Sequence, residues 1–112
     1  MSMTILTKAR GYSNAIFYDP TFRKVLEDHL ELLASSSVTA RKTITQADAN
    51  KYKWNITAFL NTVVQPDWVW LTMRLNGFEQ DLDYDGTKTT FLIPGSQDID
   101  DIVSRYLTLV GV

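Results

Sequence analysis

The sequence contains no cysteine and only one histidine in 112 residues. Without thiols, the chain can form no disulfide, no thiolate nucleophile and no cysteine-based zinc site. A single imidazole also excludes any site built from two or three histidines. No stretch approaches the roughly 20 apolar residues that span a bilayer, and the first residues, MSMTILTKARGYSNAIFYD, lack the apolar centre of a signal peptide. We therefore expect no membrane span and synthesis in the cytoplasm.

Length and composition predict one ordinary globular domain. Hydrophobic residues make up 45% of the chain and charged residues 21%, far from the charge-rich, aromatic-poor composition of disordered proteins. A chain of this length buries somewhat over about 60% of its surface on folding, which is enough for a single core.

The net charge of −2 conceals an asymmetry along the chain. Residues 1–56 hold eight Lys and Arg against five Asp and Glu, whereas residues 57–112 hold three against eight. Opposite-signed halves suit head-to-tail contact between chains, and they equally suit a match within one chain. No basic patch indicates nucleic-acid binding.

Hydrophobic periodicity divides the chain into an arm and an α+β domain. Residues 1–18 show no sustained period, so we expect an extended N-terminal arm that orders only against something else. Residues 19–112 are expected to form a single domain. Its predicted elements are helices at 19–34, 45–64, 66–76 and 96–112, and short strands at 38–44 and 89–94.

Two dipeptides predict helix ends. Asp19 precedes Pro20 at the start of the first helix, where the carboxylate accepts from unpaired amides and proline loses no hydrogen bond. Asn76 and Gly77 close the third helix, because both residue types tolerate the left-handed conformation that commonly ends a helix.

The first predicted strand carries apolar residues at alternate positions. Val38, Ala40 and Ile44 point one way and the polar residues between them point the other way. This alternation predicts a half-buried strand.

The segment QPDWVWLTMRLNGF, residues 65–78, has apolar or neutral side chains nearly all round its helix. We therefore expect this helix to be buried on both sides, by the rest of the domain or by another chain. Helical geometry puts Trp68 in the core arc and Trp70 with Arg74 on the far side, where Arg74 can stack on the indole for roughly 0.5–1 kcal/mol. Trp54 also points away from the apolar stripe of its own helix.

Two outward tryptophans indicate a contact surface. Trp and Arg dominate the energetics of protein interfaces, which favours a partner contact. The alternative is that the N-terminal helix covers these rings. The candidate interface residues are Trp54, Trp70 and Arg74, together with the apolar residues Ile5, Leu6 and Phe17 of the arm.

Two motifs that suggest chemistry have simpler interpretations. The run DLDYDG at residues 81–86 matches the first half of a calcium loop, but the position that needs a bidentate Glu is Leu92, so an acidic turn is expected. His29 lies on an apolar stripe, and its neighbour Asp28 points about 100° away, which favours a core or interface histidine over a catalytic triad. We expect no enzyme activity, no metal and no cofactor.

The run PDWVWLTMRLNGFEQDLDYDGTKTTFLIP at residues 66–94 resembles the LysM-like module of phage baseplate wedge proteins. In that module a D-W-x-W helix ends in Asn and a G-x-x-L-x-I-P strand follows. The resemblance implies a LysM-like strand-helix-helix-strand core at 38–95, with a helix and loop at 19–37 before it and a helix at 96–112 after it. The residues that carry it are Trp68, Trp70, Asn76, Gly86, Ile93 and Pro94.

The resemblance implies a structural role in a tailed-phage virion, in the baseplate of a contractile tail. The implied partners are other tail or baseplate proteins, contacted by multiple copies in a symmetric assembly. The alternative is a LysM-type module that binds peptidoglycan or another glycan. Glycan-binding members usually have a Gly-Asp-Thr turn after the first strand, where this chain has Thr45-Gln46-Ala47, so we do not expect glycan as the partner.

Overall fold

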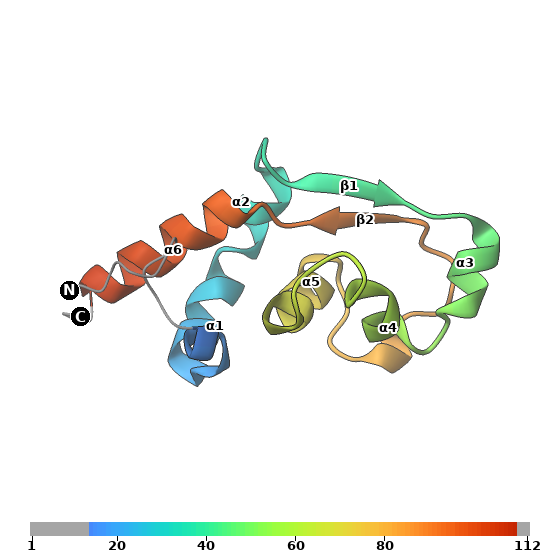
Figure 1. The fold of residues 1–112 in the computed structure, drawn as a ribbon, viewed down its shortest axis with the longest axis horizontal. Coiled ribbons are helices and arrows are strands. Elements are labelled where there is room, and N and C mark those ends of the chain that lie inside the picture. Colours follow the sequence, from blue (N-terminus) through green and yellow to red (C-terminus); the bar gives the residue numbers. More distant parts are fainter. Residues whose placement is uncertain (1–13, 110–112) are drawn as a thin grey trace.

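Helices form most of the chain, and two short strands pair into one sheet (Figure 1). The computed structural model describes residues 14–109. With η marking a 3-10 helix, the elements are η2 (Asn14–Tyr18), α1 (Pro20–Asp28), α2 (Leu30–Ser35), β1 (Ala40–Thr43), α3 (Gln46–Lys51), α4 (Ile56–Leu60), η3 (Pro66–Trp68), α5 (Val69–Leu75), η4 (Asp81–Asp83), β2 (Thr90–Ile93) and α6 (Ser96–Leu109). The predicted α+β class is confirmed.

Two groups of buried side chains lie on opposite sides of α5. One, the helical core, joins α5 to α1, α2 and α6, and the other, the sheet core, joins α5 to α3, α4 and β2. Leu71 and Leu75 belong to the helical core, whereas Val69 and Met73 belong to the sheet core. The prediction that this helix is buried on both sides is confirmed, and both sides are covered by this chain itself.

The N-terminal helix begins as predicted but is interrupted at His29. Asp19 accepts a hydrogen bond from the Thr21 amide at 3.0 Å, and Pro20 occupies the first helical position. The prediction of one helix to residue 34 is wrong. The His29 ring donates from Nδ1 to the Val25 carbonyl at 2.7 Å, the acceptor that the His29 amide would use in a continuous helix. That amide turns to the Leu26 carbonyl instead.

The predicted helix over residues 45–64 is also wrong in its continuity, because it is split into α3 and α4. Thr45 caps α3 by accepting from the Asp48 amide at 3.1 Å, as expected. The chain then turns at Trp54, whose amide donates to the Tyr84 carbonyl at 2.9 Å. Contacts with the acidic turn therefore replace the helical hydrogen bonds at this point.

The strands β1 and β2 are antiparallel, with Ala40 opposite Ile93 and Thr43 opposite Thr90. All four residues of β1 are exposed, so the predicted half-burial is wrong for Ala40, whereas Ile44, just after the strand, is partly buried against the sheet core. Val38, expected on the inner face, is 42% exposed. Figure 1 shows the reason: β1 lies on the outer side of β2, away from α4 and α5. Burial is confined to the inner strand.

The described end of the predicted arm is folded into the domain. Residues 14–18 form η2, and Phe17 is fully buried in the helical core. The Phe17 ring packs edge-on against Phe22 at 5.9 Å and Trp68 at 6.0 Å, measured between ring centroids. The expected extended conformation is therefore wrong for residues 14–18.

Candidate functional site

The third helix ends at a side chain that also completes the sheet. Gly77 adopts the predicted left-handed conformation, with φ of +89°, and Asn76 occupies the helix end. The Asn76 side chain accepts from the Leu92 amide at 2.7 Å and donates to the Leu92 carbonyl at 2.9 Å. It also donates to the Thr72 carbonyl at 2.7 Å. Asn76 therefore occupies the edge of β2 that β1 leaves open.

Sequence reasoning assigned Asn76 only to the helix end and did not foresee this second role. The sequence feature that could have indicated this role is that Leu-Asn-Gly and a strand ending in Ile-Pro occur together. Both motifs belong to the module that the sequence resembles, but the resemblance gives no physical reason for their joint occurrence. The contacts supply one, because the side-chain amide of asparagine offers the same donor and acceptor as a backbone peptide unit.

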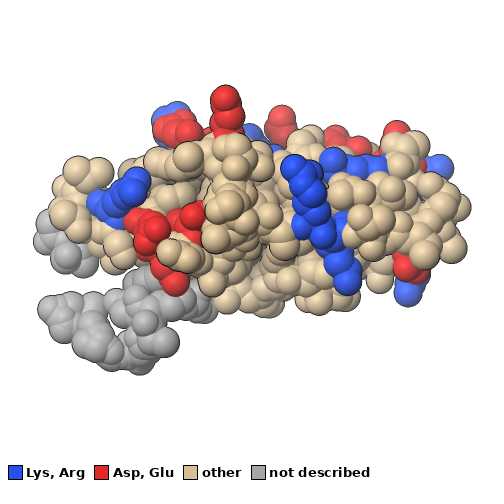
Figure 2. Space-filling view, turned by 90° about the horizontal axis from the view of Figure 1, so that it is seen from above, with Lys and Arg blue, Asp and Glu red and all other residues tan. Residues whose placement is uncertain are grey.

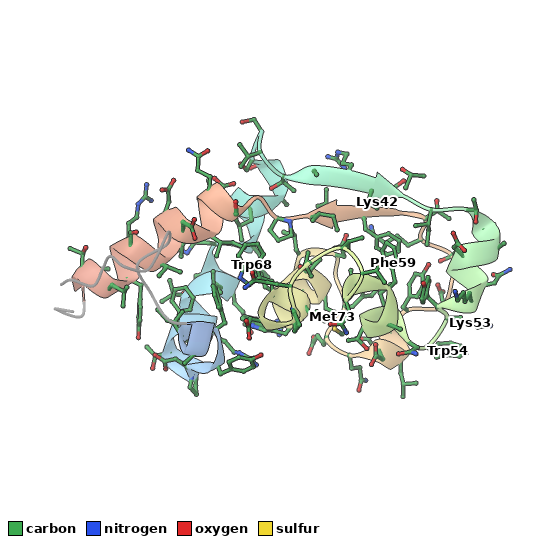
Figure 3. The ribbon with its side chains drawn as sticks, in the orientation of Figure 1. Lys42, Lys53, Trp54, Phe59, Trp68 and Met73 are labelled. Atoms are coloured by element: carbon green, nitrogen blue, oxygen red, sulfur yellow. The ribbon has the colours of Figure 1, made fainter. Side chains whose placement is uncertain are left out.

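Trp54 is an exposed aromatic residue with an unusual backbone conformation. Its ring is 49% exposed and lies at the outer end of the turn between α3 and α4 (Figure 3). Its φ is +65°, the only positive φ of a non-glycine residue among residues 14–109. A bulky side chain in this region is strained by about 1–3 kcal/mol.

Hydrogen bonds from two directions hold the strained turn. The Trp54 amide is bound by the carbonyl of Tyr84, a buried residue whose hydroxyl donates to the Lys88 carbonyl at 2.6 Å. Asp81 accepts from the Thr57 amide and the Thr57 hydroxyl, both at 2.8 Å. These contacts therefore hold the backbone of the turn, from which the half-exposed Trp54 side chain projects.

A cation already lies near the Trp54 ring. The Lys53 ammonium is 5.1 Å from the ring centroid, within cation–π range. Leu82, on the adjoining η4, is 65% exposed. Trp54 and Leu82 are thus two exposed apolar side chains on segments that hydrogen bonds tie together. We call this pair the Trp54 surface.

Trp70, the second candidate tryptophan, is covered by its own chain. The Arg23 guanidinium of α1 lies 4.6 Å from the Trp70 ring centroid and 5.3 Å from that of Tyr18. Arg23 is fixed there by donating from Nε to the Phe17 carbonyl at 2.7 Å. The N-terminal helix therefore shields this ring, leaving it half-buried.

The prediction that Arg74 stacks on the Trp70 ring is wrong. Arg74 forms an ion pair with Glu27 of α1 at 3.1 Å, with both side chains partly exposed. The cation over Trp70 comes from Arg23 instead. Of the remaining candidates, Phe17 is buried inside the domain, and Ile5 and Leu6 lie outside the described residues. The structure thus leaves Trp54 apart from the other candidates.

The acidic run at residues 81–86 is a turn whose carboxylates serve the backbone. Asp83 accepts from the amides of Glu79 and Gln80 at 2.9 and 3.2 Å. Asp85 accepts from the amide and the hydroxyl of Thr87, which lowers the pKa of the Asp85 carboxyl. The acids face different partners, and within residues 14–109 no group of three or more His, Asp or Glu side chains is placed to hold a metal.

The chain was compared with protein-family models, with curated proteins and with solved structures, and none of them matched. Among the described helices, none combines the length and the apolar character needed to cross a bilayer.

Proposed function

We propose that this chain is a structural component of a tailed-phage virion, in the baseplate of a contractile tail, and that it acts through protein–protein contacts. In this role the folded domain is a rigid unit that presents surfaces to neighbouring proteins. The proposed core is LysM-like and spans residues 38–95, with η2, α1, α2 and α6 packed beside it.

The observation that carries the proposal is the pairing of Asn76 with Leu92. The two halves of the resemblance, a tryptophan helix ending in Asn and a strand ending in Ile-Pro, meet in space through this pair of hydrogen bonds. The strand of the second half, β2, also pairs antiparallel with β1, which precedes the helices in the chain. The two motifs shared with the module are distant in the sequence, and together they join the helix to the strand.

The Trp54 surface supports contact with a partner. Backbone strain in a folded protein persists only where surrounding contacts impose it, and it gathers at functional positions. Here the strain keeps a large aromatic ring exposed, and exposed Trp is a typical anchor of protein interfaces. The energetic cost of this backbone strain to the isolated chain is explained if a neighbouring protein buries the Trp54 ring.

Co-expression with the products of adjacent genes tests the proposal. We expect the chain to co-purify with at least one of them, and a Trp54→Asn variant to lose most of the complex while keeping its fold. Leu32→Asn is the matched control, because Leu32 is another exposed apolar residue but lies on α2. Equal recovery of the wild-type and Trp54→Asn complexes would count against the Trp54 surface.

Titration calorimetry separates this role from glycan binding. We expect no heat from peptidoglycan or chitin oligosaccharides at millimolar concentration. Saturable heat that disappears in Trp54→Asn would instead assign the Trp54 surface to a sugar.

A further inference from the structure

Within residues 14–109, no strand neighbours the outer edge of β1. The sheet consists of β1 and β2 alone within the described chain, so β1 is paired on one side only. Both of its faces are also exposed. An unpaired strand with open faces is a template for one more extended segment.

The register identifies the backbone groups that face this open side. The Leu92 amide and carbonyl point away from β1, because both bind the Asn76 side chain. Arg41 lies directly opposite Leu92, and in such a pair the amides and carbonyls of both residues point outward. By the same alternation, the amide and carbonyl of Thr43 also point outward. The Ile44 amide, one residue later, points inward to the Thr89 carbonyl, as this alternation requires.

The two edges of the sheet differ in whether a side chain occupies their outward backbone groups. At the β2 edge, Asn76 occupies the amide and carbonyl of Leu92, so a further strand is blocked there. At the β1 edge, no side chain of a described residue plays the corresponding part for Arg41 or Thr43. The fold thus directs any added strand to β1.

Charge restricts what the β1 edge can accept. Arg41 and Lys42 are adjacent, so they project from opposite faces of the strand, and β1 has no acidic residue. Figure 2 looks onto this side of the molecule and shows Lys and Arg side chains in a band across it. A segment that pairs with the β1 edge meets Arg41 on one face and Lys42 on the other. Opposite charges across a strand pair are favourable, so such a segment should carry Asp or Glu at two successive positions.

A second copy of β1 does not meet this need. Antiparallel pairing of two such strands would bring the Arg41 and Lys42 side chains of both copies together, and like charges across a strand pair are destabilising. Charged residues on an edge strand prevent this kind of self-pairing.

We infer that the outer edge of β1 binds an extended acidic segment of a different protein by strand addition. The amides and carbonyls of Arg41 and Thr43 supply the backbone hydrogen bonds. Arg41 and Lys42 select two adjacent acids, and the exposed Val38 just before the strand accepts an apolar side chain. This inference rests on the proposed assembly role and names the chemistry of one partner.

The probe is a capped peptide of sequence Thr-Glu-Glu-Thr-Thr-Val-Thr. In antiparallel alignment it places its glutamates opposite Lys42 and Arg41 and its valine opposite Val38. Titration into the isotope-labelled full chain, followed by amide chemical shifts, is expected to move Arg41 and Thr43 saturably. A peptide with lysines in place of the glutamates is expected to bind at least tenfold more weakly.

Two variants separate strand pairing from simple charge attraction. Arg41→Glu combined with Lys42→Glu is expected to invert the preference, so that the lysine peptide binds at least tenfold more tightly than the glutamate peptide. Thr43→Pro removes one outward amide but no bond of the β1–β2 ladder, and it is expected to weaken the glutamate peptide at least tenfold. The Leu92 amide shift checks that this variant is folded.

Three results would overturn the inference. These are no shift in β1 at millimolar glutamate peptide, equal binding of that peptide to folded Thr43→Pro, and self-association through β1 that competes with the peptide. If Thr43→Pro does not fold, the variant that combines Arg41→Glu with Lys42→Glu still tests the inference, and an unchanged preference for the glutamate peptide would overturn it. Failure of peptide binding would leave the Trp54 surface untouched, whereas equal recovery of the wild-type and Trp54→Asn complexes, with peptide binding intact, would refute only that surface.

Discussion

Asn76 and Leu92 pair as two strand residues would, although Asn76 lies at the end of a helix. The Leu92 amide donates to Asn76 Oδ1 and Asn76 Nδ2 donates to the Leu92 carbonyl. One side chain thus joins α5 to the sheet and closes one sheet edge. Because α5 contributes to both cores, this pair lies at the end of the helix that joins the helical core to the sheet core.

Asn76→Ala is expected to lower the free energy of unfolding by about 2–3 kcal/mol, because it leaves the Leu92 amide and carbonyl without partners. Urea denaturation measures the change, and hydrogen exchange at Leu92 should accelerate. Asn61→Ala is the control. Asn61 donates one bond to the Thr57 carbonyl at an exposed site, and its loss should cost only about 0.5 kcal/mol. Equal costs would contradict the edge-closing role.

Trp54→Asn should leave the isolated domain as stable as the wild type or more stable by up to about 1 kcal/mol. Asparagine tolerates the left-handed backbone, so strain relief offsets the loss of the half-exposed ring. Trp54→Val should be less stable than Trp54→Asn by more than 1 kcal/mol, roughly, because β-branched residues fit this conformation poorly. Thermal unfolding of both variants measures the difference. A lower stability of Trp54→Asn than of Trp54→Val would refute the strain.

Arg23 and Arg74 should differ in their contribution to stability, because Arg23 lies over the Trp70 ring whereas Arg74 pairs with Glu27. Arg23→Ala removes the Phe17 carbonyl bond and the cover of the indole, so we expect a loss of about 1–2 kcal/mol. It should also increase acrylamide quenching of tryptophan fluorescence. Arg74→Ala breaks only the exposed pair with Glu27 and should cost less than about 1 kcal/mol. The reverse order would show that Arg74 covers Trp70 in solution.

Alkaline pH should destabilise the fold through Tyr84. Burial raises the pKa of the Tyr84 hydroxyl, and the nearby Asp85 carboxylate raises it further. Above the ordinary tyrosine pKa of about 10, the unfolded chain loses this proton while the folded chain retains it, so the free energy of unfolding falls as pH rises. The hydrogen bond to Asp67 raises the pKa of the Tyr18 hydroxyl, and desolvation together with the hydrogen bond to Asp19 raises the pKa of the Tyr106 hydroxyl. Both groups act in the same direction as Tyr84.

Denaturation at a series of pH values between 8 and 11, roughly, measures this effect. Tyr84→Phe should show a shallower loss of stability above pH 10 than the wild type, at the expense of the Lys88 carbonyl bond. An unchanged slope in Tyr84→Phe would exclude Tyr84 as a contributor.

Local chemistry predicted several elements well. The start of α1 at Asp19 and Pro20 and the left-handed Gly77 depend on neighbouring residues alone, and both were predicted. The two-sided burial of α5 followed from its lack of a polar face.

The wrong predictions have causes that lie outside the local pattern. The break at Trp54 depends on the Tyr84 carbonyl, about thirty residues away in sequence. The interruption at His29 depends on a side chain competing for a helical carbonyl. Alternation in β1 indicated an inner face, but whether a helix covers that face is decided by tertiary packing.

The candidate interface was predictable in part. Helical angles correctly directed Trp70 away from the core arc, but they could not reveal that Arg23 of another helix covers it. Trp54 was selected because it lies off an apolar stripe. Its strained backbone, which is the stronger argument for function, depends on long-range contacts and was invisible in the sequence.

The proposed role as an assembled tail component requires that a neighbouring protein buries Trp54. Its most direct test combines mass spectrometry of tail particles from cells that carry the gene with hydroxyl-radical footprinting of Trp54. We expect the chain at a constant multiple-copy ratio in purified particles, and slower oxidation of Trp54 there than in the free protein. Absence of the chain from the particles, or equal oxidation of Trp54 in both states, would contradict the account.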